Sequence, residues 1–293
     1  MKVAAPSSGG NSTTAAMVEL GADSEYIPKS MVELPLTLPE SLIPYEPSAT
    51  RTLRLYDAPV ELAVLPERRR REGADRDGHA PFQRSPAARI IEAEAYWRCD
   101  SLALTPNRFP FARDQRVLWM ADPAREPDRD FWRAALDWVD RSDGTALLNT
   151  IGAAATIPRA HAHLVGERLP FLDRLGERPL AAAPIRTPAG CELVCKELPR
   201  CVIGVRGPAA GRADALALLA DARATATWNV VMTREVAWVV PRALQTPRPH
   251  FPGPMGAAEF WGRFCYVEEG PFAAATAADL QSAWELATTA AIA

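Results

Sequence analysis

The chain has 293 residues, of which 48% are hydrophobic and 24% charged, and its formal net charge is −3. This composition is typical of a folded globular protein, and so small a charge gives no general attraction to nucleic acid or to anionic membranes. No apolar run approaches the roughly 18 residues that a membrane-spanning helix needs, and the N-terminus lacks the apolar core of a secretory signal. We therefore expect a cytoplasmic protein without nucleic-acid or membrane partners.

The five cysteines indicate reduced thiols, because their number is odd and no signal peptide is evident. Only Cys191, Cys195 and Cys201 lie close enough in sequence to be weighed as a metal site. Zinc sites usually add a second cysteine pair or histidines at short spacing, and neither follows here. We favour free thiols over a zinc site. We expect no required cofactor, apart from a divalent metal ion that can accompany a nucleotide.

The first 50 residues are rich in Pro, Ser, Thr, Gly and Ala and show no sustained periodicity. They predict a mobile N-terminal arm with a short ordered piece near residues 31–36. A folded domain is expected over residues 51–293, beginning with short strands over 52–56 and 59–65. The arginine-rich run Arg68–Arg71 follows. A solvated surface loop is the favoured interpretation of this run, with a phosphate-contacting loop as the alternative.

Beyond this run, apolar patterning predicts a mixture of strands and helices. Strands are expected over residues 89–97, 102–105, 116–120, 146–149, 201–206 and, as a hairpin, 228–242. Helices are expected over residues 127–141, 212–226 and 277–287, whereas 253–270 looks rich in loops. In the first helix, Phe131, Ala135, Trp138 and Val139 recur at helical spacing, which is typical of a buried stripe.

Two prolines make the segment around Asn107 and Arg108 an irregular connector between two of the predicted strands. An asparagine and an arginine exposed between strands can hold a ligand. An ordinary turn in which the asparagine side chain bonds to its own backbone fits the same pattern. Both interpretations remain open from the sequence.

The most informative stretch runs from Asn149 through a Gly/Ala-rich loop, residues 150–157, to His161 and His163. The whole chain contains four histidines, and two of them stand one residue apart here. If residues 161–165 form a strand, both imidazoles project from the same face. A loop with small side chains lets a ligand approach the backbone N–H groups closely. The stretch therefore predicts phosphate chemistry at a histidine.

A neutral histidine can accept a phosphoryl or nucleotidyl group and pass it on. Such a site needs one ring nitrogen aimed at phosphorus, the other held by a hydrogen bond, and donors for the phosphate oxygens. His163 and His161 can supply the nucleophile and a supporting donor. Asn149, the backbone from Gly152 to Thr156, and Arg159 can supply contacts to oxygen. A metal-binding pair lacks evident further ligands, and a purely structural pair is the other alternative.

Several segments together resemble the histidine-triad superfamily. The resemblance is to its nucleotidyltransferase branch, which holds diadenosine tetraphosphate phosphorylases (ATP adenylyltransferases) and galactose-1-phosphate uridylyltransferases. Besides the His-x-His stretch, the matching segments are Leu104–Phe111, similar to Asn-Lys-Tyr/Phe-Pro; Trp228–Arg242, similar to a Tyr-Asn…Pro-Arg hairpin; and Phe260–Glu268, similar to a Gly-centred strand. The resemblance covers roughly residues 85–290. It implies an α+β fold with a HIT-like antiparallel sheet and helices packed on it. The part up to about residue 185 would carry His-x-His, and the C-terminal part would complete the fold.

The resemblance also implies roles for individual residues. The second histidine of His-x-His, His163, would be the nucleophile, and His161 would support it. The nucleotide or phosphate site would be lined by Asn107, Asn149 and Asn229.

This sequence departs from the family pattern at three points. The family usually has His or Gln two residues after the nucleophile, where this chain has Val165. The family tends to run from Pro directly to His, whereas here Arg159 and Ala160 follow Pro158. Arg159 is a candidate substitute phosphate contact because a guanidinium suits that geometry. Thr156 is the candidate equivalent of the family's loop serine.

By this resemblance, the protein is expected to be a nucleotidyltransferase or phosphorylase that acts through a covalent His163–nucleotidyl intermediate. Its partners would be a nucleoside polyphosphate or nucleotide-sugar substrate and phosphate. A hydrolase of the same substrates is one alternative. A nucleotide-binding protein with weakened or lost catalysis is the other, and Val165 is the residue that would explain it.

Overall fold

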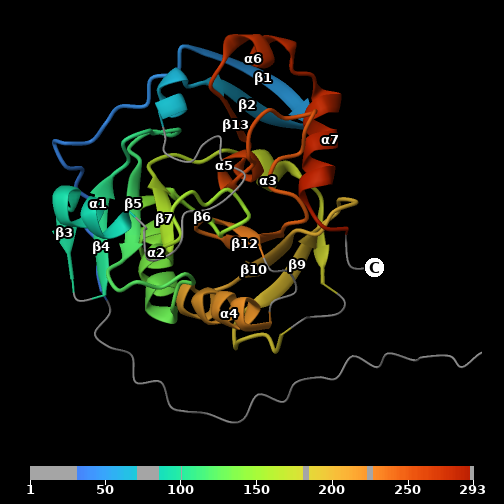
Figure 1. Cartoon of the computed structure of the whole chain (residues 1–293). Helices are drawn as coiled ribbons and strands as arrows, with labels where there is room; N and C mark the ends of the chain where they lie inside the picture. The colour runs from blue at the N-terminus through green and yellow to red at the C-terminus, as the bar shows by residue number, and fades with distance from the viewer. Residues whose placement is uncertain (1–31, 71–85, 100, 181–184, 223–226, 291–293) are drawn as a thin grey trace, which may run out of the picture. The chain divides into compact units, whose positions relative to one another are not determined.

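A ten-stranded sheet dominates the part of the chain that this computed structural model describes, namely residues 32–70, 86–99, 101–180, 185–222 and 227–290 (Figure 1). In spatial order its strands are β3 (Trp97–Arg98), β4 (Leu102–Pro106), β5 (Arg116–Met120), β7 (His161–Val165), β6 (Thr145–Asn149), β11 (Trp228–Met232), β12 (Val236–Pro241), β10 (Ile203–Arg206), β9 (Glu192–Lys196) and β8 (Glu177–Pro179). Neighbouring strands in this sheet pair antiparallel. The C-terminal half therefore extends the sheet that the N-terminal half begins, and the expected antiparallel α+β fold is confirmed.

A second, three-stranded sheet packs over one face of the large one. It contains β1 (Ala49–Leu55), β2 (Ala58–Val64) and β13 (Arg263–Tyr266), and β13 pairs parallel with β2. The short helices near it are η1 (Pro66–Arg70), α3 (Phe171–Arg174), α5 (Ala257–Trp261), α6 (Glu269–Ala274) and α7 (Ala277–Ala287). Side chains of both sheets and of α3, α5 and α7 form one buried apolar cluster, in which the Trp284 ring lies edge-on to Phe171 and Phe260. The three-stranded sheet and these helices thus form a layer on one face of the large sheet.

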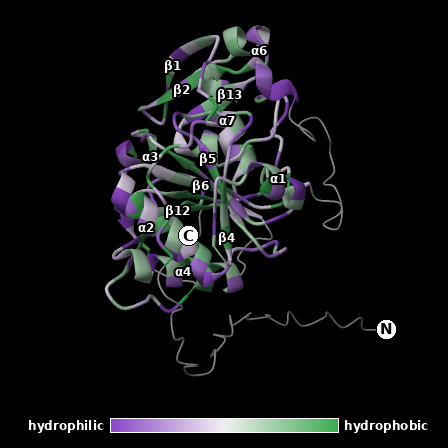
Figure 2. Ribbon diagram, turned by 90° about the vertical axis from the view of Figure 1, so that its left-hand side faces the viewer, coloured by the Kyte–Doolittle hydropathy of each residue, from purple (hydrophilic) through white to green (hydrophobic). Residues whose placement is uncertain are grey.

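Two long helices, α2 (Arg129–Ser142) and α4 (Ala209–Ala222), cover the opposite face of the large sheet (Figure 1). The apolar stripe predicted for α2 is buried in a second cluster with the strands. Asp128 begins this helix, because its side chain accepts the Phe131 N–H at 2.8 Å. Figure 2 shows apolar residues concentrated on the strands between the two layers.

The strand predicted over residues 89–97 is wrong. The chain forms helix α1 (Ala87–Glu94) there, and only Trp97–Arg98 remains as strand β3. Alternating Ala and Glu imitate a strand pattern, but both are strong helix formers. Ala87 and Ile91, four residues apart, put the buried face of the helix on β4 and β5, where they join Trp119 in a small third cluster.

Most other predicted elements are confirmed, with shifted boundaries. Helix α4 begins at Ala209 and ends at Ala222, and residues 223–226 lie outside the described residues. The loop-rich stretch 253–270 contains α5 and β13. Helix α7 begins after the Thr276 cap, which forms a capping box. None of the helices among the described residues has the length and apolarity that crossing a membrane would require.

Packed structure begins before the expected boundary at residue 50. Leu34 is fully buried against the α2 side of the sheet, and its carbonyl accepts a hydrogen bond from Arg141 at 2.7 Å. The buried Arg116 guanidinium donates to the carbonyls of residues 35–37. The predicted arm thus has a docked C-terminal part, whereas residues 1–31 and Arg71 lie outside the described residues.

Candidate active site

The two histidines of the central stretch project from the same face of β7. Strand pairing places Trp119 of β5 opposite His161 and Val117 opposite His163. His161 is only 6% exposed, His163 is half-buried, and their ring centres lie 5.5 Å apart at a steep angle of 86°. The structure therefore brings both imidazoles into one small space on the face that α1 and the three-stranded layer border.

A row of side chains crosses four adjacent strands at the level of His161. In the antiparallel β6–β7 register, Leu148 pairs with Ala162. The next residue of β6, Asn149, therefore lies opposite His161. Asn229 of β11 is in turn paired with Asn149. The row thus contains Trp119, His161, Asn149 and Asn229, and it is polar at its centre. By contrast, His163 lies between Val117 and Leu147, which are both apolar.

The proton of the neutral His161 ring is placed by a backbone carbonyl. Its Nδ1 lies 2.7 Å from the carbonyl oxygen of Arg159. A carbonyl only accepts, so Nδ1 must donate and the lone pair of the neutral ring is on Nε2. The Trp119 indole stacks on the ring at 4.8 Å and 27°, and is itself held by a hydrogen bond from its Nε1 to Thr105. The orientation of His161 is therefore fixed from two sides.

His163 carries its proton on the other nitrogen. The fully buried Gln115 accepts the Phe111 N–H through its Oε1 at 2.7 Å, which forces its amide nitrogen towards His163. This Nε2 lies 2.9 Å from His163 Nδ1. Because an amide nitrogen only donates, Nδ1 accepts and the proton of the neutral ring is on Nε2. The two histidines are thus held in opposite tautomers.

The loop between β6 and β7 uses much of its own backbone. Gly152 and Ala154 have positive φ angles of 83° and 72°. The N–H groups of Ala153 and Ala155 donate to the Thr150 carbonyl, and that of Ala154 donates to Gln245 Oε1 at 3.2 Å. Three N–H groups that the sequence offered as phosphate donors therefore already have protein acceptors. Thr156 lies half-buried in the same loop.

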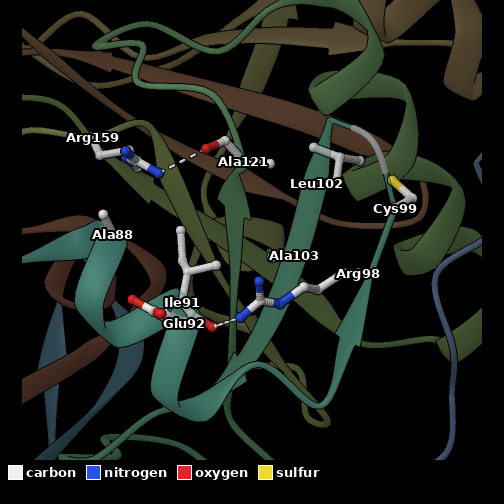
Figure 3. Close-up of a pocket in the computed structure, with 9 residues that line it drawn as sticks. All are labelled: Ala88, Ile91, Glu92, Arg98, Cys99, Leu102, Ala103, Ala121 and Arg159. Carbon is white, nitrogen blue, oxygen red and sulfur yellow. Dashed lines mark hydrogen bonds between the residues drawn. The ribbon is translucent and has the colours of Figure 1, made fainter.

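Arg159 points to one side of the histidines. Its guanidinium donates to the carbonyl of Ala121 at 2.9 Å and more weakly to that of Met120. Burial lowers the pKa of this arginine, and Asp122 partly opposes the shift. Figure 3 shows Arg159 at one end of a pocket of about 400 Å³ between α1 and β4, with Arg98 on the opposite side. Arg98 also donates to a backbone carbonyl, that of Ile91.

The Asn107–Arg108 segment serves the turn that it occupies. Asn107 accepts the Phe109 N–H at 3.2 Å and donates to the Phe109 carbonyl, which is the turn that the sequence left as one of two interpretations. Arg108 is largely exposed and forms an ion pair with Glu94 at 2.6 Å. This turn leads to Phe111, whose ring lies edge-on to His163 at 5.3 Å, so the segment shapes the site through the backbone.

Two arginine side chains, those of Arg68 and Arg242, lie near the site and contact other protein groups. The Arg68 guanidinium donates to the Phe109 carbonyl and lies over the Phe111 ring at 5.1 Å. Arg242 is 4% exposed, and burial lowers its pKa to about 9, although Glu259 opposes the shift. Within the described ranges, no group of three or more His, Cys, Asp or Glu residues has the arrangement of a metal site. The two guanidinium groups thus contribute positive charge next to the side chains of the site.

Three residues of this site were missed by sequence reasoning, namely Gln115, Trp119 and Arg242. Trp119 shares the parity of Val117 on β5, so it belongs to the face that the histidines occupy, and Gln115 contacts His163 from the position directly before β5. Choosing that face requires knowing which strand neighbours β7. Arg242 was part of the quoted Pro-Arg segment, but a sequence contains no sign that this arginine lies against an asparagine.

Comparison with known protein families finds no match for this chain, and comparison with curated proteins finds none either. Solved structures do match. Yeast Ap4A phosphorylase Apa2 in complex with Ap4A has a TM-score of 0.63 at 12% identity, over 86% of this chain and 93% of that one. The AMP complex of the same enzyme has a TM-score of 0.59 at 13% identity, over 84% and 89%. The chain has the histidine-triad-like fold of an Ap4A phosphorylase.

This histidine-triad-like fold spans nearly the whole length of the phosphorylase, so the likeness covers both halves of the large sheet. An ADP-glucose phosphorylase from Arabidopsis thaliana also matches, at 11% identity and a TM-score of 0.38, over 80% of this chain and 99% of that one. The match to the Ap4A phosphorylase, at a TM-score of 0.63, confirms the architecture expected from the sequence resemblance. Roles of individual side chains rest on the hydrogen bonds described above.

Proposed function

We propose that this protein transfers a nucleotidyl group from a nucleoside polyphosphate or a nucleotide sugar to phosphate, through a covalent histidine intermediate. The opposite tautomers of the two histidines are the observation that carries this proposal, because a nucleophile and a donor are what such a transfer needs side by side. The phosphorylase fold and the asparagine row support it. Yeast Apa2 binds Ap4A and AMP in its crystal structures, which makes a nucleoside polyphosphate the first substrate to test.

The hydrogen bonds favour His161 as the nucleophile and His163 as the donor, which exchanges the roles expected from the sequence. A neutral imidazole attacks through the nitrogen that bears the lone pair, and in His161 this is Nε2. In His163 the same atom carries the proton, so it suits donation to a phosphate oxygen or a leaving group. Asn149 lies beside His161 in the row and offers a further donor for the phosphate oxygens.

The family spacing supports the exchange as well. Counted from His161, the residue two positions on is His163, which is one of the two residue types usual there. Arg159 then directly follows Pro158, at the position of the family's first histidine. With this numbering Val165 lies outside the motif and explains nothing about activity. Both assignments keep the motif on the same strand face, because side chains alternate with a period of two.

The proposed transfer has two steps. First, His161 Nε2 attacks the α-phosphorus, the P–N bond forms, and the bond to the leaving phosphate oxygen breaks. The ring becomes cationic and keeps its Nδ1 proton, which the Arg159 carbonyl stabilises. Second, an oxygen of inorganic phosphate attacks the same phosphorus and the P–N bond breaks. The products are a nucleoside diphosphate and the neutral His161 in its original tautomer, so neither atoms nor charge are left over.

The experiment that tests this function follows label from [α-³²P]ATP and labelled diadenosine tetraphosphate into the protein, with and without phosphate. We expect an acid-labile, base-stable adduct that phosphate discharges as a nucleoside diphosphate. His161→Ala should form no adduct. His163→Ala should still form it, about 100-fold more slowly, since one transition-state donor is lost. His250→Ala is the matched control, because its half-buried ring lies beside Asp279 instead.

The outcomes separate the alternatives. Discharge of the adduct by water as fast as by phosphate would indicate a hydrolase. Nucleotide binding without any adduct in the wild type would contradict the covalent mechanism and leave a binding protein. An adduct that survives His161→Ala and disappears in His163→Ala would restore the roles expected from the sequence.

A further inference from the structure

The two asparagines of the row are connected to a buried arginine. Asn229 is fully buried, and its Oδ1 accepts a hydrogen bond from Arg242 Nη1. Its Nδ2 donates to Asn149 Oδ1 at 2.7 Å and to the Ala153 carbonyl at 2.8 Å. Guanidinium groups only donate and backbone carbonyls only accept, so these two neighbours fix which way the Asn229 amide faces.

The orientation of Asn149 follows from that of Asn229. Its Oδ1 accepts from Asn229 Nδ2 and also from the Ala257 N–H, at 2.7 Å each. Two donors on one oxygen hold the oxygen inward, and the amide N–H groups of Asn149 consequently face the other way. Asn149 is half-buried and lies next to His161, so these N–H groups are available to a ligand at the histidine.

Arg242 itself is held rigidly. Its other N–H groups donate to the carbonyls of Ala287, Met255 and Leu244, at 2.7 to 2.9 Å. Its guanidinium lies over the Phe260 ring at 4.6 Å. All these acceptors are neutral, so none of them cancels the positive charge of the guanidinium. The hydrogen bond from Arg242 to Asn229 is therefore charge-assisted. Such a bond polarises the amide that accepts it and strengthens the next donor in the chain.

We infer that Arg242 is a positioning residue, which through Asn229 fixes the Asn149 amide with its N–H groups towards a nucleotide phosphate beside His161. The inference rests on the proposed function for the identity of the ligand. Arg242 lies two residues away from that ligand along the chain of hydrogen bonds and contributes orientation and polarisation. This positioning role requires an arginine, because the ammonium group of a lysine cannot donate to four acceptors that lie in one plane.

Asn229→Asp is the sharpest test. The aspartate still accepts from Arg242 and gives the buried cation a charged partner, but it cannot donate to Asn149 or to Ala153. The Asn149 amide should then turn and present its oxygen to the phosphate. We expect AMP and inorganic phosphate, measured by titration calorimetry, to bind about 10- to 100-fold more weakly, the loss of one hydrogen bond to a charged group.

Arg242→Lys should weaken the same binding about 10-fold, with a larger effect on KM than on kcat in any active assay. Arg212→Lys is the matched control, because Arg212 is equally buried on the opposite face and bonds to Asp140 and Thr233. It should lower the denaturation midpoint without changing affinity. The Asn149 side-chain amide resonances, assigned by their loss in Asn149→Asp, should shift in Asn229→Asp and Arg242→Lys but not in Arg212→Lys.

Unchanged AMP affinity and an unmoved Asn149 resonance in Asn229→Asp would overturn the inference, as would Arg242→Lys that loses stability alone. A wild-type protein that binds neither AMP nor phosphate would defeat the proposed function instead. In that case the amide resonances, which need no ligand, still decide whether Arg242 orients Asn149.

Discussion

Gln115 determines where its neighbouring histidine carries a proton. The Phe111 N–H fixes the Gln115 amide, and this amide makes His163 Nδ1 an acceptor. On the same face, a backbone carbonyl makes His161 Nδ1 a donor. Two imidazoles one residue apart therefore present different chemistry at the same ring position. Such a difference is a property of single hydrogen bonds and not of the strand.

Ring-nitrogen NMR of a ¹⁵N-histidine sample should read this arrangement directly, since the chain contains only four histidines. We expect a protonated Nδ1 in His161 and a protonated Nε2 in His163. In Gln115→Glu, the carboxylate faces His163 Nδ1 and should attract a proton there, while the His161 pattern stays unchanged as an internal control. The same tautomer on both rings of the wild type would contradict the assignment.

At this scale the sequence predicted which residue types gather and not how they are oriented. His161, His163, Asn149 and Asn229 do lie together on neighbouring strands. Their pairing could be anticipated from strand alternation and from the family resemblance. The opposite tautomers could not, because they depend on Gln115, which directly precedes β5, and the sequence does not specify the position of β5 relative to β7.

Among the secondary structure elements, patterning predicted strands and long helices well and short elements poorly. Helix α2 has a wide apolar stripe and an N-cap, so its prediction was confirmed. Helix α1 was predicted as a strand because the alternation of Glu and Ala over residues 92–95 follows two apolar residues and imitates a strand period, although the segment also suits a helix. Helix α5 has five residues, all buried, and therefore has no amphipathic signal. Tertiary contacts decide such segments, and a pattern cannot supply them.

The β8–β9–β10 edge contains a charge cluster whose contribution depends on pH. Glu177 of β8 accepts from Arg206 at 2.8 and 2.9 Å and from Lys196 at 3.2 Å. The hydrogen bond from Arg206 is the main cause that lowers the pKa of Glu177; burial opposes it and Lys196 adds to it. Lys196 is nearly buried, over the Trp238 ring at 3.9 Å.

A carboxylate with a lowered pKa in the folded state stabilises that state above its unfolded pKa of about 4.5. This contribution should be lost as the pH falls through the lower folded value. Glu177→Gln should therefore reduce the free energy of unfolding by about 1 to 2 kcal/mol near pH 7, discounted for partial solvent screening. The difference should vanish at low pH, where the wild-type carboxyl is neutral as well.

Urea denaturation of both proteins from pH 7 down to pH 3 measures this difference. Glu192→Gln is the control on the neighbouring strand, since Glu192 is exposed and its substitution should change stability by less than about 0.5 kcal/mol. A difference between Glu177→Gln and the wild type that persists unchanged at pH 3 would show that the cluster acts through packing and not through charge.

At the scale of the described domain, one sheet links segments far apart in the sequence. Strands β3 to β7 form one side of the sheet and β8 to β12 the other, and the two groups meet where β6 pairs with β11. The C-terminal part was expected to complete the fold, but the sequence does not specify which strands meet, because strand order depends on contacts between residues some 80 positions apart. Residues 32–37 add a further connection, since Leu34 is buried behind α2.

Leu34→Ala should therefore destabilise the whole domain and not a local arm. Removing a fully buried leucine side chain costs about 2 to 5 kcal/mol. Differential scanning calorimetry should show one transition at a lower midpoint. Leu36→Ala, at a side chain that is 43% exposed, should leave the midpoint within a degree or two as the control. An unchanged midpoint in Leu34→Ala would mean that this segment is not part of the cooperative unit.

The distance between the strands that carry the row from Trp119 to Asn229 also has a consequence for the site. Adjacent strands in a sheet lie about 4.8 Å apart, and His161 and Asn149 stand on adjacent strands of one register. Under the proposed roles, an attacking nitrogen approaches phosphorus at about 3 to 3.5 Å, while the amide donates to one of its oxygens at about 2.9 Å. A single tetrahedral phosphate fits between those two side chains, because its phosphorus can meet the nitrogen while one of its oxygens meets the amide. The pitch of the sheet thus sets, before any loop is considered, the spacing between the side chain that attacks and the side chain that holds the oxygen.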